Sequence, residues 1–224
     1  MRRHLLSVLA AVAAPFAALL APLAPVDADP GAVVFPGMEV RQDTNVCTLG
    51  FVDPQQRVAY TAGHCRGSGA VSDSGGNVIG VQTGFQDNTP DGTTIDVNHQ
   101  ISDWQTIALA PEVQANNLLP SGRALVADAS VVPTRGMPVC HFGVMTGESC
   151  GVVEAVNNGW FTMANGVVSK KGDSGGPVYT NTPDARAVII GMFNSTWGQF
   201  PAAVSWQAAT QQAGQGVVIT AGAA

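Results

Sequence analysis

The chain has 224 residues, 46% of them hydrophobic, and a net charge of −6 at neutral pH. Without residues 1–28 the balance is 8 basic against 15 acidic residues, so the net charge becomes −7. This charge would repel phosphate groups, which argues against nucleic acid and anionic membranes as partners. The length allows one large domain or two smaller halves with a buried core.

Residues 1–28 have the pattern of a secretory signal peptide. Residues 1–4 form a basic start, an apolar stretch follows, and residues 26–28 place small side chains where a signal peptidase cleaves. Prolines interrupt the apolar stretch, and no second apolar segment of about 20 residues follows, so no membrane span is expected. We therefore expect a secreted or extracytoplasmic protein without membrane attachment, exported by either the general or the twin-arginine route.

Short β-rich segments separated by glycine and proline dominate the rest of the chain, and such spacing predicts an all-β barrel or sandwich. Residues 111–122 lack alternation and predict a connector between an N-terminal half at 29–115 and a C-terminal half at 116–224. Helical periodicity at 206–213 predicts one short C-terminal helix. The β-rich segments are 46–52, 57–63, 77–84, 93–99, 106–110, 138–144, 150–156, 159–163, 187–193 and 202–206.

Four cysteines lie outside the leader, namely Cys47, Cys65, Cys140 and Cys150. In an exported protein an even number of cysteines predicts two disulfides. A zinc site would need four converging ligands at short paired spacings, which neither pair of cysteines shows, so no bound metal is expected.

The stretch KKGDSGGPVY at 170–179 places Ser174 among glycines. A serine hydroxyl becomes a good nucleophile when a nearby base takes its proton and a third group orients that base. The histidines outside the leader are His64 within TAGHC, His99 and His141.

TAGHC at 61–65 and GDSGGP at 172–177 together resemble the histidine and nucleophile loops of the trypsin/chymotrypsin superfamily of serine proteases. Residues 138–153 are similar to a cysteine-bracketed segment of its small secreted bacterial members, the α-lytic protease type. The resemblance implies two packed six-stranded antiparallel β-barrels with the catalytic residues between them. It also implies the disulfides Cys47–Cys65 and Cys140–Cys150.

By this resemblance His64 is the general base, Ser174 is the nucleophile, and the backbone N–H groups of Gly172 and Ser174 form the oxyanion hole. Glycine lets the chain turn sharply enough to aim both amides at one point. The bacterial members resemble D-x-x-x-[VI]-x-L, which residues 103–109 match, so Asp103 is expected as the third member of the triad. Asp96 is the alternative.

In this family the acid before the nucleophile is paired with a cation that locks the oxyanion loop. Asp173 holds the position of the acid, and His141 stands where bacterial members carry an arginine. We expect a protonated His141 to support the loop through Asp173, with Arg123 and Arg135 as alternatives.

The substrate pocket is expected at Val168, Ser169, Trp197 and Gly198. Val168 stands where trypsin-type members have an aspartate, so the resemblance does not support cleavage after lysine or arginine. Lys170 and Lys171 would favour acidic side chains if they lie at the rim of the cleft.

These features predict a secreted, monomeric serine endopeptidase that hydrolyses a peptide or protein substrate through an acyl-enzyme and needs no cofactor. The alternative is a catalytically silent homologue that acts as a binding protein. An α/β-hydrolase esterase is not supported, because the flanks of residues 172–176 are β-rich rather than a strand-to-helix turn.

Overall fold

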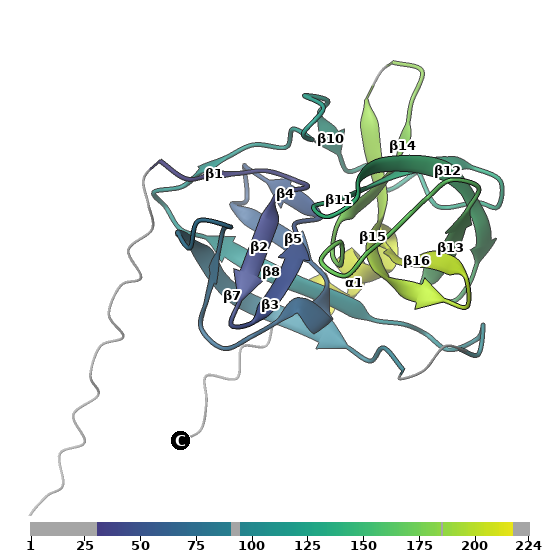
Figure 1. The fold of residues 1–224 in the computed structure, drawn as a ribbon, viewed down its shortest axis with the longest axis horizontal. Helices are drawn as coiled ribbons and strands as arrows, with labels where there is room; N and C mark the ends of the chain where they lie inside the picture. The colour runs from purple at the N-terminus through teal and green to yellow at the C-terminus, as the bar shows by residue number, and fades with distance from the viewer. Residues whose placement is uncertain (1–30, 91–94, 185, 217–224) are drawn as a thin grey trace, which may run out of the picture.

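The computed structural model describes residues 31–90, 95–184 and 186–216, and the leader expected at 1–28 lies outside these ranges. Two β-sheet units lie side by side, the N-terminal unit in purple to teal and the C-terminal unit in green to yellow (Figure 1). A short two-stranded sheet packs on the N-terminal unit, and one helix contacts both units.

The N-terminal unit is one curled antiparallel sheet. Its described strands are β2 (Glu39–Gln42), β3 (Asn45–Thr48), β4 (Phe51–Asp53), β5 (Val58–Thr61), β6 (Ala70–Ser72), β7 (Val78–Asp87) and β8 (Asp103–Leu109). Their order in the sheet is β3-β2-β6-β7-β8-β5-β4. The edge strands β3 and β4 are separated in the chain by only Leu49 and Gly50, so the chain itself brings the two edges of the sheet together.

The C-terminal unit is a closed barrel. Its described strands are β10 (Leu125–Val126), β11 (Pro138–Gly143), β12 (Gly147–Val156), β13 (Trp160–Ala164), β14 (Pro177–Asn181), β15 (Ala187–Trp197) and β16 (Phe200–Ser205). The order is β10-β15-β14-β11-β12-β13-β16, and β15 also pairs with β16. That pairing closes six of these strands into a barrel, while β10 adds to β15 in parallel.

A short two-stranded sheet and one helix complete the fold. β1 (Val33–Val34) pairs in parallel with β9 (Gln114–Ala115), in the segment that leads from the first unit to the second. The helix α1 (Trp206–Gly216) contacts β15 and β16 and also β7 and β8 of the N-terminal unit. The Trp206 ring lies 4.8 Å from Phe51 and 4.9 Å from Tyr60, between ring centroids. The helix therefore packs across the boundary.

Buried apolar side chains form a core inside each unit and a third cluster between the units. Ile79 and Ile107 lie in the first core, and Phe161 and Ile190 in the second. The cluster between the units includes Trp104 and residues of α1. Because burial of apolar surface stabilises each contact, this third cluster holds the two units in one relative position.

The expected all-β fold with two barrel-like units and a C-terminal helix is confirmed. The strand expected at 93–99 is wrong over its described part: Asp96 accepts a hydrogen bond from the N–H of Asn98, and the chain turns there. Aspartate favours such local bonds over strand pairing. Both disulfides implied by the resemblance are present. Within the described ranges, no helix has the length and apolarity to cross a membrane.

The Cys140–Cys150 disulfide joins directly opposed residues of β11 and β12 that are 10 positions apart in the sequence. Removing it frees the unfolded chain, so we expect the Cys140→Ala/Cys150→Ala double variant to lose about 2–3 kcal/mol of unfolding free energy. Urea unfolding followed by tryptophan fluorescence should show a lower midpoint. A midpoint equal to that of the wild type would contradict this expectation.

Candidate active site

His64 lies in η1 (Gly63–Cys65), a 3₁₀ turn shortly after β5. Its Nδ1 lies 2.7 Å from Oδ2 of Asp103, and its backbone N–H donates to Oδ1 of the same carboxylate at 2.8 Å. Asp103 is fully buried at the start of β8, whereas Asp96 is exposed and bonds to its neighbour Asn98. The structure thus brings Asp103 to His64, and not Asp96.

The environment of His64 raises the pKa of its imidazole above the ordinary value of 6.5. Burial by itself lowers this pKa, but the hydrogen bond and the negative charge of Asp103 outweigh burial. Asp87 adds a smaller contribution in the same direction, which Arg66 partly offsets. A raised pKa makes the neutral imidazole a stronger proton acceptor, as a general base requires.

Asp103 has a further partner that sequence reasoning missed. Asn194, on β15, donates from Nδ2 to Oδ2 of Asp103 and to Oγ1 of Thr89, the latter at 3.1 Å. Its side chain is buried at the end of the apolar run AVIIGMF, residues 187–193. A buried amide next to such a run needs a hydrogen-bond partner inside the protein. The position of Asn194 after this run is therefore the feature of the sequence that could have indicated its role.

The nucleophile loop, residues 172–176, turns sharply and packs on the N-terminal unit. Gly172 and Gly175 have φ angles of 104° and 83°, in the region that favours glycine. A Cβ on Gly175 would lie 2.0 Å from Oγ1 of Thr61. Thr48 holds the loop: its N–H donates to the Ser174 carbonyl at 2.8 Å, and its hydroxyl donates to the Gly172 carbonyl at 2.9 Å.

Two amides of this loop have no acceptor in the described part of the chain. The N–H groups of Asp173, Gly175 and Gly176 donate to backbone carbonyls, whereas those of Gly172 and Ser174 donate to none. Donors left free on the nucleophile and on the residue two positions before it are arranged as an oxyanion hole requires.

Asp173 is fully buried, and neutral donors satisfy its carboxylate. Oδ1 accepts the N–H groups of Met145 and Thr146 at 2.8 and 3.2 Å. Oδ2 accepts the Thr146 hydroxyl at 2.8 Å and the Lys170 N–H at 2.7 Å. Asp173 therefore ties the loop to the β11–β12 turn and needs no cation.

The expectation that His141 is the cation for Asp173 is corrected by this geometry. His141 is fully buried, its Nδ1 lies 3.3 Å from the Pro177 carbonyl oxygen, and its ring lies 4.9 Å from that of Phe193. No hydrogen bond or ion pair joins His141 to Asp173 among the described residues. Burial lowers the pKa of His141 to about 4, although the charge of Asp173 and the bond to Pro177 act in the opposite direction. The imidazole is thus neutral at neutral pH.

The two alternative cations do not reach Asp173 either. Arg123 donates to Oδ1 of Asn181, and Arg135 bonds to Glu154 at 3.4 Å. Both pairings lie on the exposed surface, as ordinary surface arginines do.

Two cavities adjoin Ser174. One, of about 750 Å³, is lined by residues that include His64, Gly172 and Ser174, together with Cys47 and Met145. The other, of about 350 Å³, shares only Lys171 and Ser174 with the first. It is lined by Ser169, Lys170, Lys171, Ser174, Phe193, Asn194, Ser195 and Thr196.

The smaller cavity contains one of the four residues expected at the substrate pocket. Ser169 lines it, and its Oγ lies 3.4 Å from Oγ1 of Thr196 on the facing strand. Val168 is instead exposed, Trp197 is buried against Trp160, and Gly198 lies in the turn after β15. The residues of β15 that line this cavity, Phe193 to Thr196, directly precede the expected Trp197 and Gly198.

Comparisons with known proteins agree with this geometry. No family model matches the chain. Two Mycobacterium tuberculosis proteins, both named as uncharacterized proteins and coming from strains CDC 1551 and H37Rv, are each 56% identical over 204 residues. The match covers 90% of this chain and 92% of each relative. The chain therefore belongs to the same family as these two mycobacterial proteins.

Solved structures of bacterial serine proteases share the fold. A glutamic acid specific serine protease, described as using a histidine triad in substrate binding, has a TM-score of 0.56 and 21% identity over 81% of this chain and 97% of its own. Nocardiopsis protease has a TM-score of 0.55 and 20% identity over 82% and 96%. Thermobifida fusca protease A has a TM-score of 0.54 and 17% identity over the same shares. The fold is thus that of the chymotrypsin-like bacterial serine proteases.

The lowered pKa of His141 predicts acid sensitivity of the fold. Because the folded pKa of about 4 lies below 6.5, the unfolded chain binds this proton first as the pH falls. The contribution of His141 to the unfolding free energy is therefore fully present above pH 6.5. It declines by about 3 kcal/mol as the pH falls towards 4. We expect the unfolding free energy of His141→Phe to fall less steeply in this interval, measured by urea unfolding at each pH. The same substitution at exposed His99 is the control, and parallel curves for wild type and His141→Phe would contradict the assignment.

Proposed function

We propose that this member of the mycobacterial family is a serine endopeptidase that acts through an acyl-enzyme. The observation that carries the proposal is the convergence of His64, Ser174 and the free amides of Gly172 and Ser174 on one cavity, with His64 oriented by Asp103. We further propose that the mature chain is secreted, is monomeric, needs no cofactor, and takes a peptide or protein as substrate.

The proposed mechanism follows from the contacts of each group. Asp103 accepts the Nδ1–H of His64, which leaves Nε2 with a lone pair for the proton of the Ser174 hydroxyl. Ser174 Oγ then attacks the substrate carbonyl, and the amides of Gly172 and Ser174 stabilise the oxyanion, each worth about 3 kcal/mol. The protonated His64 next gives its proton to the leaving amine, and water hydrolyses the ester by the same steps.

A catalytically silent homologue is the competing function. The sequence offers two reasons for it. Thr106 stands directly before the Ile-Ala-Leu run, where a common pattern of the resembled family has the acid, and His141 replaces the arginine expected as the partner of Asp173. Asp103 in contact with His64, and four neutral donors on Asp173, weaken both reasons. An active-site probe separates the two functions, because only an activated serine reacts with a fluorophosphonate.

We propose that the residue on the acyl side of the cleaved bond is acidic. The sequence contains two lysines, Lys170 and Lys171, and both line the smaller cavity beside Ser174. Neither forms an ion pair within the described ranges, and no acidic residue lines this cavity. The hydroxyls of Ser169 and Thr196 can donate to a carboxylate there.

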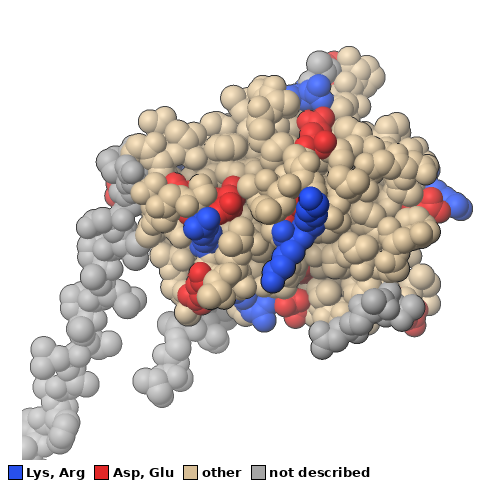
Figure 2. All heavy atoms as spheres, viewed as in Figure 1, with Lys and Arg blue, Asp and Glu red and all other residues tan. Residues whose placement is uncertain are grey.

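Two further observations support an acidic substrate residue. Basic side chains stand as a few separate groups on the face shown in Figure 2, and both lysines of the chain line the cavity beside Ser174. A positive charge at the cleft of an otherwise acidic protein concentrates negatively charged ligands there. In addition, one of the proteases with this fold is named as glutamic acid specific.

The triad assignment predicts specific losses of activity. Ser174→Ala and His64→Ala should lower kcat by about 10⁴–10⁶ while the protein stays folded. Asp103→Asn should lower kcat by about 10⁴, because it favours the wrong imidazole tautomer. Fluorophosphonate labelling and peptide hydrolysis are the measurements. Asp96→Asn is the matched control and should behave as wild type; peptidase activity in Ser174→Ala would refute the assignment.

The charge of the smaller cavity predicts a substrate preference that substitution of a lysine should weaken. Peptides that differ only in the residue before the cleaved bond should rank glutamate above glutamine, leucine and arginine in kcat/KM. We expect Lys171→Met to reduce the preference for glutamate over glutamine about fivefold, an effect that salt should weaken. Arg135→Met removes an equal charge away from both cavities and is the control. A preference for glutamate that is unchanged from the wild type in both Lys171→Met and Lys170→Met would exclude the lysines as its source.

A further inference from the structure

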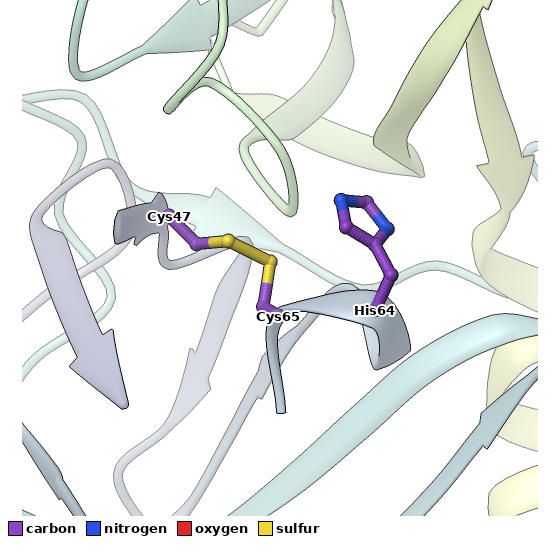
Figure 3. A group of neighbouring side chains, drawn as sticks. All are labelled: Cys47, His64 and Cys65. Atoms are coloured by element: carbon purple, nitrogen blue, oxygen red, sulfur yellow. A yellow bond between two sulfur atoms is a disulfide. The ribbon is translucent and has the colours of Figure 1, made fainter. Parts of the chain in front are cut away.

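Three potential metal ligands meet beside the nucleophile. Cys47 on β3 and Cys65 on η1 form a disulfide next to His64, as Figure 3 shows. A ring nitrogen of His64 and both sulfur atoms all lie within 4.8 Å of one another. The Cys65 Sγ also lies 3.8 Å from the Ser174 carbonyl oxygen, so the group adjoins the nucleophile loop.

The disulfide makes both sulfurs poor ligands, but reduction would change this. Thiolate sulfur and neutral imidazole nitrogen are the ligands that zinc prefers. Two thiolates would balance the two charges of the ion, so the three ligands and the ion together would be neutral, although Arg41 and Lys171 line the same cavity. The Cα atoms of Cys47 and Cys65 are 6.1 Å apart, which leaves room for an ion between their side chains.

The surroundings of His64 already match those of a metal-bound histidine. Its Nδ1 is bonded to Asp103 at 2.7 Å, so Nε2 is the nitrogen left for a ligand. Metal-ligating histidines almost always carry a carboxylate or carbonyl on the other ring nitrogen, which fixes the tautomer and the ring orientation. Cys47 and His64 both line the cavity of about 750 Å³, which gives a reductant and an ion a route to the group.

We propose that reduction of the Cys47–Cys65 disulfide creates a zinc-type site formed by Cys47, Cys65 and Nε2 of His64. A dithiol reductant transfers two electrons and two protons to the disulfide, giving two thiols and its own disulfide. The divalent cation then binds both sulfurs and the imidazole and releases the two thiol protons. With three ligands from the protein, a fourth position would be left for water.

This site would switch off the proposed peptidase. A metal on Nε2 occupies the lone pair that must take the proton of Ser174, so the reduced, metal-bound chain would be silent and the oxidised chain active. The silencing rests on the proposed function, whereas the metal binding does not.

The second cysteine pair, Cys140 and Cys150, could also bind metal after reduction and must be distinguished from the proposed site. Cys140, Cys150 and the exposed Glu148 also lie within 4.8 Å of one another. That group lacks a histidine, and a carboxylate suits zinc less well than an imidazole held by a buried acid. Its binding of metal after reduction must therefore be measured separately.

The test is a titration of the reduced, full-length protein with Co²⁺, followed by competition with Zn²⁺. We expect a sulfur-to-cobalt charge-transfer band, a rise in Tm with added metal, and loss of fluorophosphonate labelling. A chelator followed by reoxidation should restore the labelling. The oxidised protein should show neither the band nor the rise in Tm.

Variants assign the ligands. Cys47→Ser/Cys65→Ser keeps the second cysteine pair and should lose both the high-affinity Co²⁺ binding and its charge-transfer band. His64→Asn should weaken Co²⁺ binding and change the visible spectrum of the bound ion. Asp103→Asn should lower Co²⁺ affinity about 10–100-fold, as loss of a ligand-orienting partner does. Equal Co²⁺ binding by the wild type and Cys47→Ser/Cys65→Ser would overturn the proposal, as would a His64→Asn spectrum identical to that of the wild type.

Fluorophosphonate labelling of the reduced protein that persists in saturating Zn²⁺ would overturn the silencing alone. A failure of the oxidised protein to label refutes the proposed peptidase and leaves the Co²⁺ titration decisive for the metal site.

Discussion

The buried carboxylate of Asp103 is the constraint on which the rest of the site depends. A carboxylate removed from water is costly unless hydrogen-bond donors replace the lost hydration. Here the donors are the backbone and ring N–H groups of His64, from the N-terminal unit, and the amide of Asn194, from the C-terminal barrel. The two units must therefore keep a fixed relative position, and the apolar cluster between them, together with α1, provides it.

Asp173 solves the same physical problem in a different way. Its donors are three backbone amides and one hydroxyl, and none of these groups titrates near neutral pH. The order of the oxyanion loop is thus separated from the titration of His141. That histidine instead packs as a neutral ring against Phe193, in the core behind the smaller cavity.

Ser174 lies between two chemically different surroundings. On one side are hydroxyls and the lysines of the smaller cavity, and on the other are His64 and the Cys47–Cys65 disulfide. In the proposed peptidase, substrate selection and control of His64 therefore act from opposite sides of Ser174. Such a separation lets either property change by substitution without disturbing the buried acids that position the site.

The sequence by itself determined the all-β class from its short β-rich segments and turns. Its resemblance to the serine proteases implied the two barrels, both disulfide pairings and the candidates His64, Asp103 and Ser174, because that resemblance depends on local motifs. The sequence could not place Asn194 on Asp103, since residues 91 positions apart meet only when the two barrels pack. It also misjudged the charge of His141, and it could not show which residues of β15 line the smaller cavity beside Ser174. Whether an imidazole beside a carboxylate is charged depends on how deeply the fold buries it, and which residues of β15 face Ser174 depends on the pairing of that strand in the closed barrel.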